Sequence, residues 1–283
     1  MERYFIMPRY GLVIDVNKCC GCYNCFLACK DEHCGHDFPG YSAAQPMTGQ
    51  FWMNIVEKER GQYPKVKLAY IPVPCQHCED APCVISAENE AVYRREDGII
   101  IIDPEKAAGQ RQIVASCPYG VIYWNEEKNI PQKCTLCAHL LDAGWKEPRC
   151  VEMCPTGALA FGDFDDPASE VSKLLASGST ESLNSESRLK EKVVYVNLPK
   201  IFISGMVIFG DTEECARGAR VSLTGNGEKM TAETDFFGDF EFEKLEKDMD
   251  YVIKIDSKGY QPQEIKVKTE TDIYLGIIRM KKV

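Results

Sequence analysis

The sequence predicts an α+β protein in which a cysteine-rich region of short strands and helical turns precedes a small antiparallel β-sandwich. Fourteen of the 15 cysteines lie between Cys19 and Cys154, and only Cys215 follows them. Residues 177–191 are rich in Ser, Glu and Asn and poor in apolar side chains, which is typical of a linker. From residue 201 onwards, apolar and polar side chains alternate as in half-buried strands. We therefore expect a cysteine-rich region at residues 1–164, a helix and linker at 165–195, and a seven-stranded sandwich at 196–283.

The composition narrows the classes of protein to which the chain can belong. At 283 residues and 45% hydrophobic side chains, the chain is long enough for two domains that each bury a core. Its net charge of -10 argues against a nucleic-acid partner, because phosphate binding needs a basic surface. No apolar run approaches the ~18 residues of a membrane-spanning helix, so direct membrane insertion is not expected. We find no secretory signal, and a reducing cytoplasm suits a cysteine-dense chain that is loaded with metal.

The first cysteine run has the spacing of bacterial ferredoxins. Cys19, Cys22, Cys25 and Cys29 form a C-x₂-C-x₂-C-x₃-C pattern. In this pattern three closely spaced thiolates bind one four-iron cube, and the fourth, on a following helix, binds a second cube. Zinc sites seldom use this triple spacing, so an iron-sulfur site is favoured over a zinc site.

The second run is incomplete, and its missing positions form a set. Cys75, Cys78 and Cys83 lack a fourth cysteine at position 87, and Cys117 resembles the last ligand of another run. Exchange of the fourth ligand between runs gives one complete site, held by Cys75, Cys78, Cys83 and Cys117. The partner site would need cysteines where the chain has Ala87, Ala107, Gln110 and Ile113. Because all four are missing together, we interpret the pattern as one lost site beside one complete site.

The last cysteine set completes the count of expected ligands. Exchange gives two further sites, which are Cys19, Cys22 and Cys25 with Cys154, and Cys134, Cys137 and Cys150 with Cys29. Taken alone, the set from Cys134 to Cys154 is also compatible with zinc. Three cysteines remain as plain buried or loop thiols, namely Cys20, Cys34 and Cys215.

Several basic side chains neighbour the expected ligands. A cation beside a cluster favours the more negative reduced state and so raises its potential, and the candidates are Lys18, Lys30, Lys133 and Arg149. His77 and His139 could act through hydrogen bonds to sulfur, with simple packing as an equal alternative. His33 and His36 are expected in a polar loop beside a cluster.

The C-terminal third has a different pattern. Asp165, Asp166 and Pro167 predict the start of a short helix, which the linker follows. Strands are expected at residues 201–209, 219–223, 229–234, 239–242, 251–255, 264–267 and 273–278. Residues 234–242 resemble the turn and strand of carboxypeptidase-regulatory-like and transthyretin-like sandwiches. This region has no nucleophile paired with a base, no phosphate loop and no metal cluster, so we expect a structural role.

The cysteine-rich region contains five short motifs, which are Cys-Gly-Cys-Tyr-Asn-Cys, Cys-Gln-His-Cys-Glu-Asp-Ala-Pro-Cys, Arg-Arg-Glu-Asp-Gly-Ile, Cys-Pro-Tyr-Gly and Cys-Pro-Thr-Gly-Ala-Leu. With these motifs the region resembles the iron-sulfur subunits of the dimethyl sulfoxide reductase family of molybdopterin enzymes. Such subunits usually carry four cubane clusters, and this chain lacks the ligands of one. That departure, with residues 38–41, residues 51–55 and the β-domain, looks most like the small subunits of pyrogallol-phloroglucinol transhydroxylases and related anaerobic arene hydroxylases.

The resemblance implies a role and a partner. The chain would carry three 4Fe-4S clusters, transfer electrons and have no catalytic residue of its own. It would form a heterodimer or larger complex with a large catalytic subunit that holds molybdopterin with molybdenum or tungsten, and its β-domain would dock onto that subunit. The alternatives are an electron-transfer subunit of another oxidoreductase of this family, a free-standing ferredoxin-like carrier, and a zinc-stabilised binding module.

Overall fold

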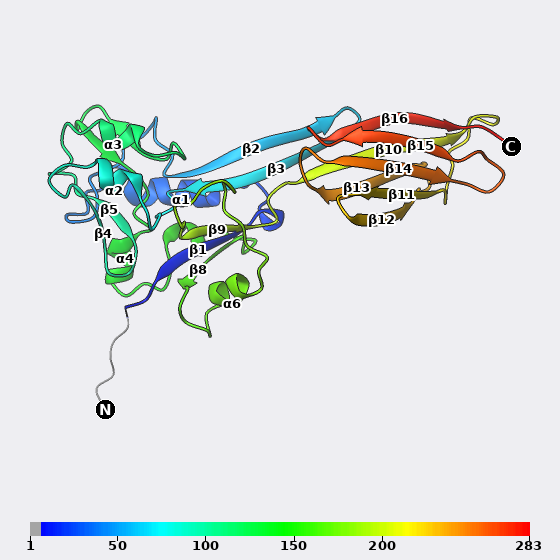
Figure 1. The fold of residues 1–283 in the computed structure, drawn as a ribbon. Helices are drawn as coiled ribbons and strands as arrows, with labels where there is room; N and C mark the ends of the chain where they lie inside the picture. The colour runs from blue at the N-terminus through cyan, green and yellow to red at the C-terminus, as the bar shows by residue number, and fades with distance from the viewer. Residues whose placement is uncertain (1–6) are drawn as a thin grey trace. The chain divides into compact units, whose positions relative to one another are not determined.

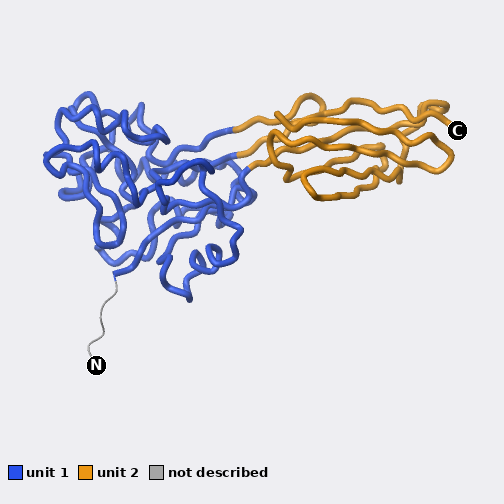
Figure 2. Tube along the Cα trace, viewed as in Figure 1, with its two compact units in different colours: residues 1–57, 70–198 blue, residues 58–69, 199–283 orange. Residues whose placement is uncertain are grey.

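The computed structural model describes residues 7–283, which divide into two units (Figure 2). Unit 1 consists of the described residues up to Glu57 together with residues 70–198. Unit 2 consists of residues 58–69 and 199–283. Unit 2 is built of strands, and the short helices are all in unit 1 (Figure 1). No helix in the described part of the chain is long and apolar enough to cross a bilayer.

Unit 1 contains a small mixed sheet and two short hairpins. The sheet has the order β8-β1-β9, in which β1 (Tyr10–Asp15) pairs antiparallel with β8 (Leu159–Asp163) and parallel with β9 (Val193–Val196). The hairpins pair β4 (Val92–Arg94) with β5 (Ile100–Ile102), and β6 (Tyr123–Asn125) with β7 (Ile130–Gln132). Strand β9 was not expected, since residues 165–195 were assigned to a helix and linker.

The helices of unit 1 connect these strands and precede or follow the cysteines. They are α1 (Asn24–His33), α2 (Pro82–Ser86), α3 (Gln112–Ala115), α4 (Ala138–Asp142), α5 (Arg149–Glu152) and α6 (Glu170–Ala176), with a 3-10 turn at Val16–Lys18. Helix α6 begins later than the sequence predicts. Its N-cap is Ser169, whose hydroxyl accepts a hydrogen bond from the backbone of Ser172. The Asp166 carboxylate instead accepts from Ala168 N in a preceding turn, so it caps that turn and not the helix.

A long pair of strands reaches from unit 1 into unit 2. It is formed by β2 (Met53–Gln62) and β3 (Lys65–Pro74) and is visible in Figure 1. Residues 58–69, the tip of this pair, are part of unit 2, although the sequence alone assigned them to the cysteine-rich region. Within unit 2, Arg60 forms an ion pair with Asp272 at 2.8 Å and Lys65 forms one with Asp239 at 2.5 Å. These contacts explain why a segment distant in sequence belongs to this unit.

Unit 2 has seven further strands in two sheets that share one core. One sheet has the order β13-β10-β16 and the other β12-β11-β14-β15. The strands are β10 (Ile201–Phe209), β11 (Arg220–Gly225), β12 (Glu228–Glu233), β13 (Asp239–Leu245), β14 (Asp250–Asp256), β15 (Gln263–Lys268) and β16 (Ile273–Met280). Buried side chains of both sheets, such as Ile203, Phe240, Val221 and Ile253, form a single cluster. Alternating burial along each strand produces this core.

One pairing in unit 2 corrects the expectation of a wholly antiparallel sandwich. Strand β16 pairs parallel with β10, with Ile203 opposite Ile273 and Phe209 opposite Met280. The other pairings in the two sheets are antiparallel. Period-two alternation reports which side chains are buried but not the direction of the neighbouring strand, so the sequence pattern could not reveal this parallel pairing.

Candidate metal centres

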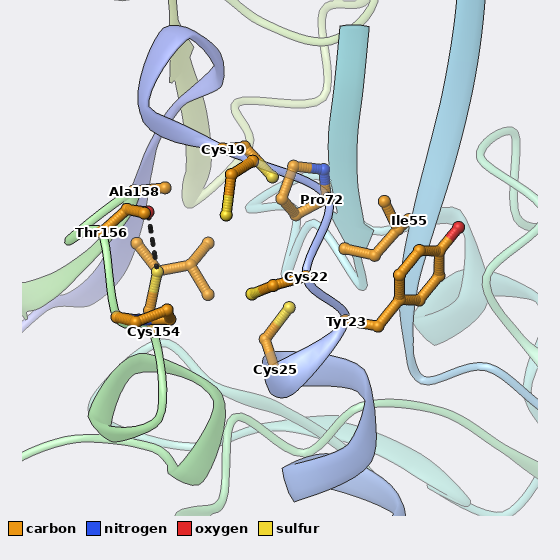
Figure 3. Close-up of a pocket in the computed structure, with 13 residues that line it drawn as sticks. Cys19, Cys22, Tyr23, Cys25, Ile55, Pro72, Cys154, Thr156 and Ala158 are labelled. Carbon is orange, nitrogen blue, oxygen red and sulfur yellow. Dashed lines mark hydrogen bonds between the residues drawn. The ribbon is translucent and has the colours of Figure 1, made fainter.

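The first group of thiols, which we call site A, surrounds one pocket. Cys19, Cys22 and Cys25 come from the turn before α1 and its first turn, and Cys154 follows α5 (Figure 3). The four side chains point toward a common space with an empty volume of about 320 Å³. Gly21 shapes this turn with a φ of +66°, and a Cβ there would lie 2.6 Å from the ring of Tyr70. Any other residue would therefore strain the turn.

Backbone donors make the thiolate of Cys154 favourable in site A. Burial raises the pKa of Cys25 to about 12, against an opposing hydrogen bond from the Phe26 backbone. Burial also opposes ionisation of Cys154. In that case the hydrogen bonds from the backbone of Leu159 and from Thr156 outweigh it, and the pKa is lowered. A ring of N–H and O–H donors around a sulfur is typical of metal-bound thiolates.

The second group, site C, surrounds a pocket of similar size. Cys75, Cys78, Cys83 and Cys117 line it, and its empty volume is about 330 Å³. Cys117 follows α3 and is far from the other three cysteines in sequence. Burial raises the pKa of Cys83 to about 11, and the charge of Lys133 opposes this rise.

The third group, site B, is the most deeply buried. Cys29, Cys134, Cys137 and Cys150 are all buried. Burial raises the pKa of Cys29 well above its usual range, and the neighbouring Cys134 and Cys137 raise it further. Burial and the same two neighbours also raise the pKa of Cys150 well above its usual range. Cys29, the last cysteine of the first run, therefore lies with the third set of thiols.

The four positions without cysteine also lie together. Ala107 and Ile113 are fully buried in one apolar cluster, and Ala87 packs against it. Gln110 Oε1 accepts from the backbone N of Glu88 at 2.8 Å, and its Nε2 donates to the backbone O of Lys106 at 2.8 Å. Apolar side chains and the hydrogen-bonded amide of Gln110 therefore fill this part of unit 1.

Two buried side chains, Lys133 and His77, both contact Ile100, which lines the pocket of site C. The Nζ of Lys133, only 2% exposed, donates to the carbonyl oxygens of Ile100 at 2.5 Å and Cys134 at 3.0 Å. The Ile100 backbone N donates to Nδ1 of His77 at 3.0 Å. Burial lowers the pKa of His77 well below its usual range, and the charge of Lys133 adds to this. A buried ammonium held only by carbonyl oxygens needs a nearby anion to offset its desolvation.

His33 corrects the expectation of a polar loop. It is 2% exposed at the end of α1, and its Nε2 lies 3.8 Å from Sγ of Cys137. Burial lowers the pKa of His33 to about 3. His33 is four residues after Cys29, so both lie on one face of α1, and this helical spacing was the signal that could have identified it.

The remaining side chains singled out from the sequence are less closely involved. His139 Nε2 lies 3.0 Å from Glu32 Oε1, and Arg149 pairs with the same carboxylate at 3.4 Å. Lys30 donates to the carbonyl of Pro46, and the side chain of Lys18 is 55% exposed. Of the three cysteines outside the sites, Cys20 and Cys215 are exposed and Cys34 Sγ lies 3.8 Å from Sδ of Met47.

The number and kind of side chains at each site fit a four-iron cluster. Sites A and C each place four cysteines around one pocket, and a cubane of four irons takes four thiolates. Zinc is also held by four thiolates in some structural sites, so the choice of iron rests on the ferredoxin spacing of the first run.

Comparison with known proteins identifies similar chains. Residues 66–164 match the family described as the 4Fe-4S dicluster domain. The chain is 42% identical over 282 residues to the pyrogallol hydroxytransferase small subunit of Pelobacter acidigallici, which covers 97% of this chain and 100% of that protein. It is 37% identical over 170 residues to the protein NrfC of Escherichia coli strain K12, which covers 59% of this chain and 71% of that protein.

Two further comparisons are more limited. The arsenate respiratory reductase iron-sulfur subunit ArrB of Shewanella sp. strain ANA-3 is 30% identical over 236 residues, covering 66% of this chain and 96% of that protein. Among solved structures, 5-hydroxyisourate hydrolase of Klebsiella pneumoniae covers 28% of this chain and 90% of that chain, with 18% identity and a TM-score of 0.25. A likeness at that level does not identify a fold family for unit 2.

Proposed function

The chain belongs to the iron-sulfur subunits of the dimethyl sulfoxide reductase family of molybdopterin enzymes, and we propose that it holds three 4Fe-4S clusters beside a molybdopterin catalytic subunit. When bound, each cluster accepts and donates single electrons. The chain's own residues hold the clusters, keep water from them and direct N–H groups at their sulfurs.

The observation that carries this proposal is the exchange of the fourth thiol between runs. Cys154 lies with Cys19, Cys22 and Cys25, while Cys29 lies with the third set. Exchange of this kind is the hallmark of ferredoxin-type pairs of cubanes. The proposed ligands are Cys19, Cys22, Cys25 and Cys154 for site A, Cys29, Cys134, Cys137 and Cys150 for site B, and Cys75, Cys78, Cys83 and Cys117 for site C.

The packing at the four positions without cysteine supports three clusters and not four. Ala107 and Ile113 occupy the space with buried apolar side chains, and Gln110 is fully paired to backbone atoms. None of these side chains offers the thiolate that a four-iron cluster takes as its ligand.

Within the family, we favour a partner that transfers hydroxyl groups between arenes anaerobically in the cytoplasm. The similarity to the pyrogallol hydroxytransferase small subunit extends over 97% of the chain, so it includes unit 2. The similarities to ArrB and NrfC cover only 66% and 59% of the chain. A subunit of another oxidoreductase of this family is the second candidate, because iron-sulfur subunits of such enzymes are also similar to this chain.

Metal analysis tests the cluster proposal directly. Purified anaerobically with its large subunit, the chain should contain ~12 iron atoms, with one molybdenum or tungsten in the large subunit. The variant Cys154→Ser should lose ~4 of these, whereas the matched variant Cys215→Ser, at an exposed cysteine outside the sites, should lose none. A content of ~16 iron atoms would refute the proposal of three clusters and not four, and zinc in place of iron would refute the redox role.

A second experiment separates the two candidate partners. The purified complex is incubated anaerobically with pyrogallol and a small amount of a tetrahydroxybenzene as hydroxyl donor, and phloroglucinol is measured by chromatography. Because hydroxyl transfer between arenes has no net electron demand, product should form without an external acceptor. Turnover that requires an added electron donor or acceptor would instead indicate an oxidoreductase.

We further propose that unit 2 is an independent β-domain that docks onto the catalytic subunit. This role is motivated by a second domain whose sequence shows no motif for catalysis, phosphate binding or metal binding. Its deletion should weaken assembly with the large subunit in gel filtration, and undiminished assembly would exclude the role. Because residues 58–69 belong to unit 2, the deletion must replace them by a short turn and remove residues 199–283 at once.

A further inference from the structure

The ring of His77 is fixed in one protonation form by a single backbone contact. The N–H of Ile100 donates to Nδ1 at 3.0 Å, so Nδ1 acts as an acceptor and carries no proton. The proton of the imidazole is therefore on Nε2. The carbonyl of the same residue, Ile100, accepts from Nζ of Lys133, so the peptide groups on both sides of this residue are held.

The opposite ring atom has no partner in the protein. Nε2 of His77 is buried, and within the described chain no atom, sulfur included, lies at hydrogen-bond distance from it. The residue as a whole is only 1% exposed. A buried N–H donor without an acceptor costs free energy, so native proteins rarely leave one unpaired.

The position of His77 suggests what the acceptor is. His77 lies between Cys75 and Cys78 in the sequence and lines the pocket of site C. It has a φ of 44°, in the left-handed region where asparagine is tolerated better than most residues. A free donor is thus held at the wall of a pocket whose proposed occupant has sulfur atoms on every side.

We propose that Nε2 of His77 donates a hydrogen bond to a sulfur of the cluster in site C and thereby raises the reduction potential of that cluster. This inference rests on the proposed function, because it requires a 4Fe-4S cluster in site C. A donor to sulfur stabilises the reduced cluster more than the oxidised one, since the reduced cluster is more negative. Backbone N–H groups also donate to thiols of the sites, as at Cys154 in site A and Cys117 in site C, so His77 would add a side-chain donor to those of the backbone.

Two substitutions separate this role from a structural one. In His77→Asn, the side-chain oxygen can replace Nδ1 as acceptor for Ile100, but the donor toward the pocket is lost. In His77→Gln, the amide nitrogen replaces Nε2 as donor, but the acceptor for Ile100 is lost. A tuning role predicts an effect in the Asn variant and near wild-type behaviour in the Gln variant, and a purely structural role predicts the reverse.

The measurement is a redox titration of the anaerobically purified complex, followed by electron paramagnetic resonance. We expect His77→Asn to lower the reduction potential of one cluster by up to ~59 mV, which is a tenfold change in the equilibrium constant of a one-electron couple. The potentials of the other two clusters should not change. His36→Gln, at an exposed histidine, is the matched control and should change no potential. Unchanged potentials in His77→Asn, or a shift only in His77→Gln, would overturn the inference.

A second readout does not depend on a stable variant of His77. His33→Gln removes the imidazole that lies 3.8 Å from Sγ of Cys137 in site B. In this variant complex labelled with ¹⁵N-histidine, pulsed resonance of the reduced clusters should still detect a coupled imidazole nitrogen, and its absence would contradict the hydrogen bond of His77. Failure of the proposed function gives a different result, because wild-type protein would then lack iron or cluster signals before any variant is compared.

Discussion

The two units of the chain reach stability in different ways. Unit 2 has strands of six to nine residues, and buried side chains of both its sheets form one continuous core. Unit 1 has hairpin strands of only three residues and helices α2 to α5 of four or five, and cysteines of all three sites are among its buried side chains. Such short elements are marginal without further cross-links. We infer that metal at the cysteine sites cross-links the short elements of unit 1.

Removal of iron should produce the largest difference between the units. Without its clusters, unit 1 keeps buried thiols whose pKa burial raises, such as Cys29 and Cys150, and loses three cross-links. We expect anaerobic chelation to make residues of unit 1 exchange amide hydrogens rapidly, while the strands of unit 2 stay protected. Hydrogen exchange with mass spectrometry measures both at once. Equal loss of protection in both units would show that unit 2 does not fold on its own core.

A core substitution should have the reverse effect. Ile253 is fully buried between the sheets of unit 2, so Ile253→Ala should lower the free energy of unfolding of this unit by about 2–5 kcal/mol. The iron content should not change, because no cysteine site is in this unit. Ile277→Ala, at a half-exposed position on β16, is the control and should cost far less. Denaturant unfolding by circular dichroism, together with iron analysis, checks both. Loss of iron in Ile253→Ala would show that the units depend on each other.

This contrast also explains how much the sequence could predict. The seven strands of unit 2 were predicted within a few residues, because alternation of apolar side chains directly reports burial. The spacing of the cysteines predicted which thiols belong together, and the structure groups the same thiols, although their role as ligands stays a prediction. Ligand chemistry requires fixed spacing, so it leaves a signal in a single sequence.

Features that depend on long-range contacts were not predictable in this way. The parallel direction of β16 and the membership of residues 58–69 in unit 2 depend on partners that are distant in sequence. Strand β9 contains Val194 and Tyr195 but follows a polar segment, which hid it behind linker composition. The buried position of His33, by contrast, could have been inferred from its spacing of four residues from Cys29, but the polar side chains around it in α1 favoured the prediction of a loop.

Substitutions at the four positions without cysteine should act like substitutions in an ordinary core, although these positions are in unit 1. Gln110 pairs with Glu88 and Lys106, so Gln110→Ala should lower the free energy of unfolding by about 1–2 kcal/mol. The potentials of the three clusters should stay the same. Gln112→Ala, at an exposed glutamine, removes only a long 3.4 Å bond to Oε1 of Gln110, which keeps its backbone partners, so this control should have little effect. Denaturant unfolding followed by visible absorbance measures the change, and loss of ~4 iron atoms in Gln110→Ala would contradict a site without metal.

The smallest expected effect concerns the polar contacts between residues 58–69 and the rest of unit 2. Lys67 pairs with both Glu241 and Glu243, and its hydrogen bond lowers the pKa of Glu243 below the usual 4.5. Because that pKa is lowered by folding, the stabilisation is complete above pH 4.5 and is lost as the pH falls through the folded-state pKa. Solvent screening limits it to less than about 1 kcal/mol.

The variant Lys67→Met should therefore flatten the pH dependence of unit 2 stability in the acidic range. Thermal unfolding of the iron-free chain between pH 7 and about pH 3, read at the transition of unit 2, measures this dependence. Lys268→Met removes an exposed pair with Glu270 at 3.6 Å and should leave the pH dependence unchanged. A small change in Lys67→Met means that residues 58–69 add only a polar attachment to a core that is stable without them. A collapse of unit 2 at neutral pH would mean that its stability depends on this tip, and that the apolar core alone does not explain the difference between the units.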